Sequence, residues 1–194
     1  MPVLLVLISA VIAVGSGQAQ ILTAPNPRLT LGISSGTSGI EIEVPLTLTP
    51  AKDGEVGKIQ AEITFPSEIM SFLKVSQYLA VDQDVKIEAK VQNDEVVQND
   101  EIVQSKELKE NEPPRSRLEI TLESPTKPLP AGILTTLVFQ FAEEVEPQII
   151  GLGLSARMWA FPDLSQEITA VETYEGRISI QEPDVFFGCF FYMH

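Results

Sequence analysis

Hydrophobic and polar residues alternate along two segments of this chain. In the segment 58–65 every second side chain is apolar, at Ile59, Ala61, Ile63 and Phe65. The segment 133–141 has a similar pattern, with apolar side chains on one side at Ile133, Leu137, Phe139 and Phe141. A period of two is typical of a β-strand with one buried and one solvated face. Both segments are therefore predicted to be strands that cover a core.

Shorter alternating runs recur along the chain. They lie at 29–33, 40–48, 85–91, 118–122, 150–156 and 174–180. Stretches rich in Gly, Pro, Ser and Asp separate several of them and favour turns. Because we find no convincing helical period between these runs, the sequence predicts an all-β fold, an antiparallel β-sandwich.

Two places depart from simple alternation. Pro45 lies inside the run 40–48, and because proline cannot donate to a strand ladder it predicts an edge position or a bulge. Residues 67–75 carry apolar side chains at uneven spacing. We interpret this second stretch as a buried connection in preference to a single helical turn.

A tandem duplication follows the run 85–91. Val-Gln-Asn-Asp-Glu occurs at 91–95 and again at 97–101, within a stretch from Asp82 to Glu112 that holds ten acidic residues and four lysines. A calcium site is the chemical alternative, but the carboxylate and glycine spacing of an EF-hand loop is absent. We interpret the segment as a solvated loop or long hairpin, and we expect the fold to survive excision of residues 93–110.

Length and charge limit the classes of partner. The 194 residues suit one domain with a substantial core, because 44% of them are apolar. The formal net charge is −14. Nucleic acid and anionic membranes are bound through basic surfaces, so neither is an expected partner.

The N-terminus predicts export. Residues 3–14 are apolar and uncharged, and the small residues that follow resemble the cleavage site of a signal peptide over residues 1–19. The apolar run is shorter than the roughly 20 residues that span a bilayer. We therefore expect a secreted or extracellular protein, with the periplasm or cell surface as alternatives, whose mature chain starts with an extended leader over 20–28.

The residues needed for common catalytic and metal sites are missing. Cys189 is the only cysteine, and His194, the only histidine, is the last residue. This composition disfavours an internal disulfide, a histidine-dependent nucleophile and a zinc site. We expect no catalytic residue, metal or cofactor. The apolar tail over 182–194 holds four phenylalanines, and its role stays open between docking on the sandwich, pairing with another chain and a truncated reading frame.

Three segments in order resemble the bacterial cohesin domain and its carbohydrate-binding-module relatives. They are 44–48 together with 57–69 (Gly-Lys-Ile-Gln-Ala-Glu-Ile-Thr-Phe-Pro-Ser-Glu-Ile), 130–139 (Pro-Ala-Gly-Ile-Leu-Thr-Thr-Leu-Val-Phe), and 175–180 (Glu-Gly-Arg-Ile-Ser-Ile). In that family the matching strands end in Tyr-Asp-Pro, carry Gly-x-Leu-x-x-Leu-x-Phe and close with Gly-x-Ile/Val-x-Ile. Here Thr64-Phe65-Pro66 stands in place of Tyr-Asp-Pro. The resemblance covers residues 29–181 and implies a jelly-roll sandwich that serves as a non-catalytic binding module.

The resemblance implies a protein partner, either a dockerin-like domain or another secreted protein. It also implies that the protein acts within a polysaccharide-degrading or cell-surface assembly. The alternation predicts that the contact surface is one sheet face with the outward residues Arg117, Glu119, Thr121, Thr136 and Gln140. None of these positions is fixed by a family motif. Each is also compatible with an ordinary solvated strand position.

Direct binding of a polysaccharide is the alternative function. Sugar-binding faces carry exposed aromatic rings, and Trp159 is the only tryptophan, with Tyr78 and Tyr174 as further candidates. The apolar neighbours of Trp159 predict instead that its ring is in the core or fixes a loop. An enzyme is the third hypothesis, but no pair of carboxylates stands out among the many present. A structural role in a cell-surface assembly is the fourth hypothesis.

Overall fold

A computed structural model of the protein describes residues 24–52, 54–77, 84–93 and 114–182. Several expectations fall outside these ranges. They concern the signal peptide, the first residues of the leader, the duplication from residue 94 onward, Tyr78, and the apolar tail from residue 183 with Cys189 and His194.

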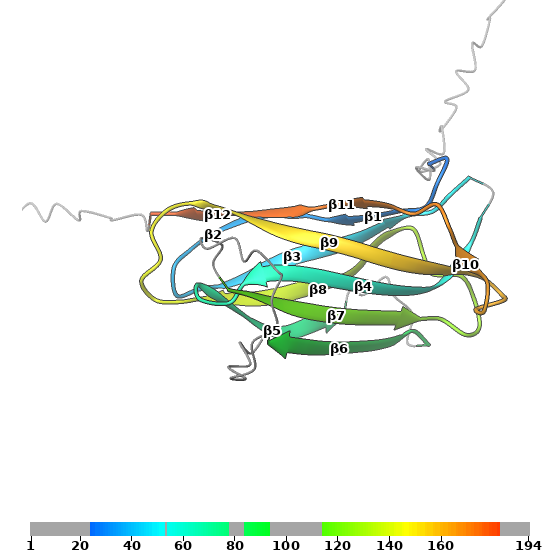
Figure 1. Ribbon diagram of the computed structural model, residues 1–194, viewed down its shortest axis with the longest axis horizontal. Helices are drawn as coiled ribbons and strands as arrows, with labels where there is room; N and C mark the ends of the chain where they lie inside the picture. Colours follow the sequence, from blue (N-terminus) through cyan, green and yellow to red (C-terminus); the bar gives the residue numbers. More distant parts are fainter. Residues whose placement is uncertain (1–23, 53, 78–83, 94–113, 183–194) are drawn as a thin grey trace, which may run out of the picture.

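The described chain forms two β-sheets that pack face to face as an elongated sandwich (Figure 1). The described residues contain twelve strands and no helix, so the prediction of an all-β sandwich is confirmed. One sheet has five strands, in the spatial order β11 (Glu172–Tyr174), β1 (Arg28–Leu31), β3 (Glu41–Thr49), β8 (Gly132–Phe141) and β5 (Met70–Gln77).

The other sheet has seven strands and faces the viewer in Figure 1. Its spatial order is β2 (Ile33–Thr37), β12 (Gly176–Gln181), β9 (Ile149–Ala160), β4 (Val56–Pro66), β7 (Arg115–Glu123) and β6 (Lys86–Asn93), and β10 (Glu167–Ile168) pairs with the end of β9. From β12 to β6 every neighbouring pair is antiparallel.

The core lies between the sheets and consists of the side chains that the alternation places inward. Ile59, Ala61, Ile63 and Phe65 of β4 are all at most 2% exposed, as predicted. Across the core, the ring of Phe139 on β8 makes edge contacts with Phe65 and Phe72, at centroid distances of 5.3 and 5.7 Å. These contacts join the two sheets through interlocking aromatic rings.

The first two strands and the last two strands of the described chain each pass from one sheet to the other, and they do so side by side. The chain leaves β1 for β2 at Gly32, and it leaves β11 for β12 at Glu175. β1 runs parallel to β11 and β2 runs parallel to β12, so two parallel pairs supplement the predicted antiparallel arrangement. Ile33 therefore does not continue the buried face of Leu29 and Leu31, and it is 80% exposed because it follows the crossing.

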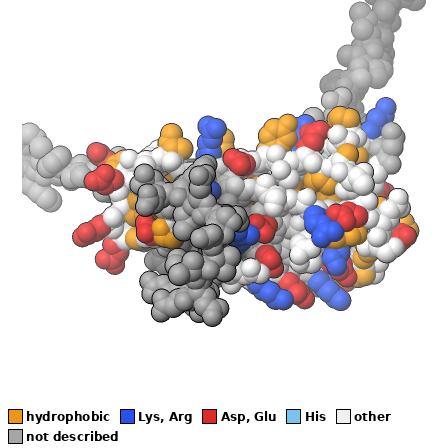
Figure 2. Space-filling model, in the orientation of Figure 1, with side chains coloured by type: hydrophobic (Ala, Val, Ile, Leu, Met, Phe, Trp, Pro, Cys, Tyr) orange, Lys and Arg blue, Asp and Glu red, His pale blue; other side chains and the backbone are white. Residues whose placement is uncertain are grey.

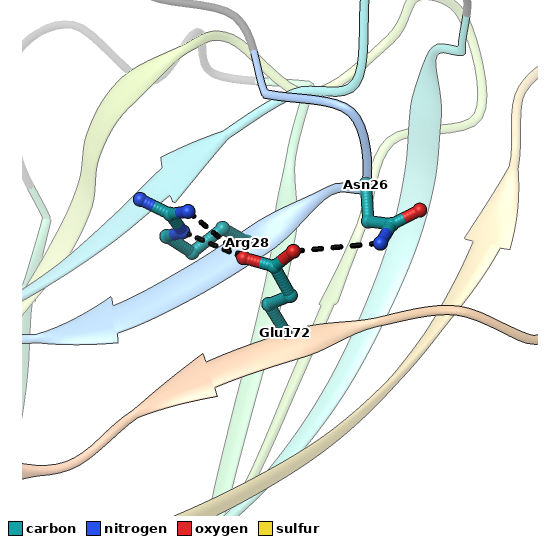
Figure 3. Close-up of polar contacts among 3 residues, drawn as sticks. All are labelled: Asn26, Arg28 and Glu172. Carbon is teal, nitrogen blue, oxygen red and sulfur yellow. Dashed lines mark hydrogen bonds and ion pairs between the residues drawn. The ribbon is translucent and has the colours of Figure 1, made fainter.

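Side chains reinforce the parallel β1–β11 pair (Figure 3). The Nε and Nη2 atoms of Arg28 donate to Oε2 of Glu172 at 3.0 and 2.8 Å, and the Asn26 amide donates to the other carboxylate oxygen at 3.4 Å. The guanidinium also lies 4.7 Å from the ring centroid of Tyr174. The hydrogen bonds from Arg28, and secondarily that from Asn26, lower the pKa of Glu172.

Of the two alternatives expected for Pro45, an edge position and a bulge, the edge strand is wrong, because β3 lies inside its sheet between β1 and β8. The Pro45 carbonyl accepts from the Gly32 amide at 2.8 Å. The nitrogen and the carbonyl of a strand residue point to the same side of the strand. The nitrogen of Pro45, which has no hydrogen to donate, therefore faces the place where β1 leaves the sheet. A bulge follows directly, between Leu46 and Thr47.

Bulges also explain two places where the alternation of apolar residues predicted the structure wrongly. Residues 67–75 are neither a connection nor a helical turn, because most of them form the edge strand β5. Its register shifts between Phe72 and Lys74, so an extra residue breaks the period of two. The bulge between β3 and β8 likewise places Leu134 in the core, while Ile133, predicted to be inward, lies opposite Thr47.

Candidate binding face

The five residues predicted to share one face lie on two different sheets. Arg117, Glu119 and Thr121 point outward from β7 in the seven-stranded sheet, between the buried residues of that strand. Thr136 and Gln140 lie on β8 in the five-stranded sheet. The prediction of a single face is therefore wrong. Alternation determines which residues of a strand point together, but not which sheet the strand joins.

The two residues on β8 also differ in exposure. Thr136 is only 9% exposed, and it lies opposite Pro45 on one side and Ser76 on the other. Gln140 is exposed at the end of the strand. On the same outward side, Val138 between them is 1% exposed. The middle of β8 thus offers little accessible surface.

The outer surface of β6, β7, β4 and β9 carries rows of polar side chains, and we call it the binding face. Each row runs across the four strands at one register position. In strand order the rows are Lys86, Glu123, Lys58 and Trp159; Glu88, Thr121, Gln60 and Arg157; Lys90, Glu119, Glu62 and Ser155; and Gln92, Arg117, Thr64 and Gly153. Figure 2 shows this side of the molecule, where basic and acidic side chains are interspersed.

Three ion pairs between described residues connect neighbouring strands on the binding face. Lys58 contacts Glu123 at 3.0 Å, and Arg117 contacts Glu62 at 3.6 Å. At the edge of the face, Arg157 donates from Nε and Nη2 to the two oxygens of Glu167 on β10, at 2.8 and 2.7 Å. These hydrogen bonds lower the pKa of the Glu167 carboxyl, which therefore stays ionised to a more acidic pH than an unpaired glutamate.

Two shallow depressions mark the binding face. One, of about 190 Å³, lies beside the small side chains of Ser155 and Ala156 on β9, and it is lined by Gln60, Ala61, Glu62, Glu119, Ser155, Ala156 and Arg157. The other, of about 360 Å³, is lined by Lys58, Gln60, Lys86, Glu88, Thr121 and Glu123. Both are open to solvent; the first is lined about equally by polar and apolar atoms and the second mostly by polar atoms. They therefore suit the side chains of a partner better than an enclosed small molecule.

Trp159 is not in the core, contrary to the expectation from its apolar neighbours. β9 buries Leu152 and Met158, and Trp159 takes the opposite side, where it lies opposite Lys58 and is only partly buried. The Lys58 ammonium is 5.5 Å and the Arg157 guanidinium 5.4 Å from its ring centroid. The ring therefore belongs to the binding face, where two cations cover it.

Apart from Trp159, the alternative carbohydrate contact, the sequence interpretation did not include the outward residues of β4, β6 and β9 in the site. Lys58, Gln60 and Glu62 were identifiable as a polar side of the first alternating segment. Their position beside β7 depends on pairing between segments about sixty residues apart in the sequence, which no local pattern encodes.

Within the described ranges, no group of three or more His, Cys, Asp or Glu side chains is arranged to hold a metal ion. The same residues include no helix that is long and apolar enough to cross a membrane.

Comparison with known proteins gives a match at the level of structure. No protein-family model and no curated protein sequence matches the chain. Among solved structures, a cohesin–dockerin complex of OlpA from Clostridium thermocellum has a TM-score of 0.57 at 16% identity, covering 80% of this chain and 99% of the other. The chain has the cohesin fold. The fold expected from the three resembling segments is confirmed.

Two further cohesins have the same fold. A non-cellulosomal cohesin from the archaeon Archaeoglobus fulgidus has a TM-score of 0.56 at 14% identity, covering 80% of this chain and 91% of the other. The third cohesin of ScaC from Acetivibrio cellulolyticus, in complex with a ScaB dockerin, has a TM-score of 0.56 at 15% identity over 79% and 98% of the two chains. At these identities the likeness establishes the fold and not the partner.

Proposed function

We propose that this protein is a secreted, non-catalytic module that binds another protein through the binding face. The observation that carries the proposal is the continuous outer surface of β6, β7, β4 and β9, whose rows of polar side chains are accessible. A flat sheet surface of this kind buries area against a partner without a deep pocket.

The cohesin fold supports a protein as the ligand. Two of the solved cohesin structures described above are complexes with dockerins. By analogy, the partner of this chain is a dockerin-like domain or another secreted protein, in a polysaccharide-degrading or cell-surface assembly. The apolar N-terminus and its small-residue cleavage site support an extracellular location.

The opposite sheet is the weaker candidate for the contact surface. Along the centre of its outer side, Thr136 and Val138 are almost fully buried. The binding face instead exposes long side chains on both sides of its two depressions. Long side chains beside hollows can interlock with a partner, which is the geometry of a packed interface.

Polysaccharide binding is the second candidate, and the outward position of Trp159 is the observation that favours it. Sugar rings stack on accessible aromatic faces, and Trp159 is partly exposed beside the depressions. However, Lys58 and Arg157 lie over its ring. A stacking sugar would have to displace one of these cations, so the protein partner is the better-supported ligand.

A parallel binding assay separates the two ligands. The purified protein is immobilised to retain proteins from the secretome of its source organism, and in a second assay it is sedimented with insoluble polysaccharides. We expect one or a few secreted proteins to be retained and then to bind stoichiometrically after purification. Sedimentation with a polysaccharide that Trp159→Ala abolishes without loss of stability would replace the protein by a carbohydrate ligand.

A further inference from the structure

Positive charge is concentrated on the outer side of the seven-stranded sheet. Of eleven described Lys and Arg residues, seven lie at outward positions of this sheet, namely Lys58, Lys86, Lys90, Arg115, Arg117, Arg157 and Arg177. Of seventeen described Asp and Glu residues, only five do, namely Glu62, Glu88, Glu119, Glu123 and Glu167. Among the described residues, this side therefore has a net charge of +2 (seven minus five), whereas the described chain as a whole has −6 (eleven minus seventeen).

The cations of this side fall into two groups. Lys58, Arg117 and Arg157 contact carboxylates of the same surface. Lys86, Lys90, Arg115 and Arg177 are exposed and form no ion pair with any residue that the structure describes. Three of these four, Lys86, Lys90 and Arg115, lie on β6 and β7, and we call them the basic edge.

The basic edge has a defined geometry. Lys86 and Lys90 point to the same side of β6, four residues apart, which corresponds to about 13 Å along a strand. Arg115 begins β7, next to the far end of β6. Glu88 lies between the two lysines, and Glu123 and Glu119 lie opposite them on β7. Positive and negative side chains thus alternate at fixed spacings.

We propose that the basic edge receives separate Asp or Glu side chains of the partner protein. This inference rests on the proposed function of the binding face and specifies the chemistry of its partner. In a chain of net charge −14, a surface with excess positive charge attracts an acidic partner in this orientation and repels it elsewhere.

The alternation of charge favours a protein over an anionic polysaccharide. A uniformly charged chain would bring its carboxylates against Glu88, Glu119 and Glu123 as well as against the lysines. A folded protein can place a carboxylate opposite each cation and a donor or cation opposite each glutamate. Such matching of unlike charges gives an interface its specificity.

A nuclear magnetic resonance titration of the whole chain tests the proposal with defined probes. The acidic probe is a peptide with repeats of Glu-Ser-Ser-Ser, whose carboxylates recur at the four-residue spacing of Lys86 and Lys90. A peptide with Lys in place of Glu is its matched control, and polygalacturonate represents anionic polysaccharides. We expect the acidic peptide to shift the amide signals of β6 and the start of β7, and added salt to reverse these shifts.

Two variants with the same change in net charge show which surface binds the acidic peptide. Lys86→Glu, Lys90→Glu and Arg115→Glu together remove the basic edge, and we expect the affinity for the acidic peptide to fall on the order of tenfold. Lys52→Glu, Lys74→Glu and Lys127→Glu together change the net charge equally outside the binding face, and this variant should retain the wild-type affinity. An equal loss in both variants would attribute the binding to net charge and overturn the proposal.

The remaining outcomes are also decisive. Absent shifts, or shifts on the five-stranded sheet, would overturn the basic edge, while retention of secreted proteins through the binding face would leave the proposed function intact. Stronger binding of polygalacturonate than of the acidic peptide, lost on removal of the basic edge, would contradict the protein partner itself.

Discussion

Gly32 lies against the ring of Pro45 at the point where the chain passes from one sheet to the other. A Cβ atom at position 32 would come within 2.5 Å of Cγ and 2.8 Å of Cδ of Pro45. The same glycine donates its amide hydrogen to the Pro45 carbonyl at 2.8 Å. The close approach that allows the crossing therefore depends on the absence of a side chain.

Gly32→Ala should destabilise the fold by about 1–3 kcal/mol, the usual cost of forcing an extra carbon into a packed site. Gly151→Ala is the matched control, because a Cβ there meets no atom within 4 Å. The control should be neutral or slightly stabilising. Urea unfolding followed by circular dichroism measures both changes, and an equal effect of the two substitutions would contradict the close contact.

The pair of Arg28 and Glu172 should make stability depend on pH. The folded protein lowers the pKa of Glu172, chiefly through hydrogen bonds from Arg28. This contribution is therefore complete above the ordinary glutamate pKa of about 4.3, and it is lost as the pH falls through the lower value of the folded state. The difference in unfolding free energy between the wild type and Glu172→Gln should shrink across that window.

Unfolding at a series of pH values, from neutral down into the acid range, measures this difference. Glu68→Gln is a suitable control, since Glu68 is an exposed turn residue that forms no ion pair with other described residues. A gap between wild type and Glu172→Gln that stays constant through the acid range would show that the carboxylate charge does not contribute.

Trp159→Ala should cost less stability than the loss of an aromatic residue from the core. Replacing a buried Phe or Trp by Ala typically costs about 3–5 kcal/mol. Phe139, which is 0% exposed and contacts two other rings, should fall in that range on substitution by Ala. Trp159 is partly exposed on the outer side of β9 and should fall below it. Denaturant unfolding of both variants gives the comparison, and equal losses would mean that Trp159 packs as a core residue.

The alternation along each strand predicted its buried side but could not predict how the strands assemble. For β4 and β7 the inward residues are those that the period of two selects. The prediction that the five residues share one sheet face was wrong, because β7 and β8 are consecutive in the chain and yet belong to opposite sheets. Sheet membership depends on long-range pairing, such as Lys58 with Glu123, which a local pattern does not contain.

Bulges and crossings caused the other differences. An extra residue in β5 removed the alternation of 67–75, and the crossing at Gly32 turned Ile33 outward. The position of Trp159, in contrast, could have been predicted from the sequence. Leu152, Leu154 and Met158 share one parity along β9, and Trp159 has the other. The parity of the strand was a better guide than the hydrophobicity of adjacent residues.

The binding face itself can be tested by two double substitutions of equal charge. Glu119→Arg with Thr121→Arg places two guanidinium groups on the binding face, at half-buried positions of β7. Glu43→Arg with Gln140→Arg places two on the opposite sheet, at exposed positions of β3 and β8. Because all four positions point outward, both variants should unfold close to the wild type, which thermal denaturation verifies.

The most direct test measures the affinity of these two variants for a purified protein that the wild type retains from the secretome. We expect the variant with Glu119→Arg and Thr121→Arg to lose at least about tenfold in affinity, which corresponds to roughly 1.4 kcal/mol, while the variant with Glu43→Arg and Gln140→Arg binds as the wild type does. Unchanged binding by the first variant, together with loss in the second, would contradict the account and place the contact on the five-stranded sheet.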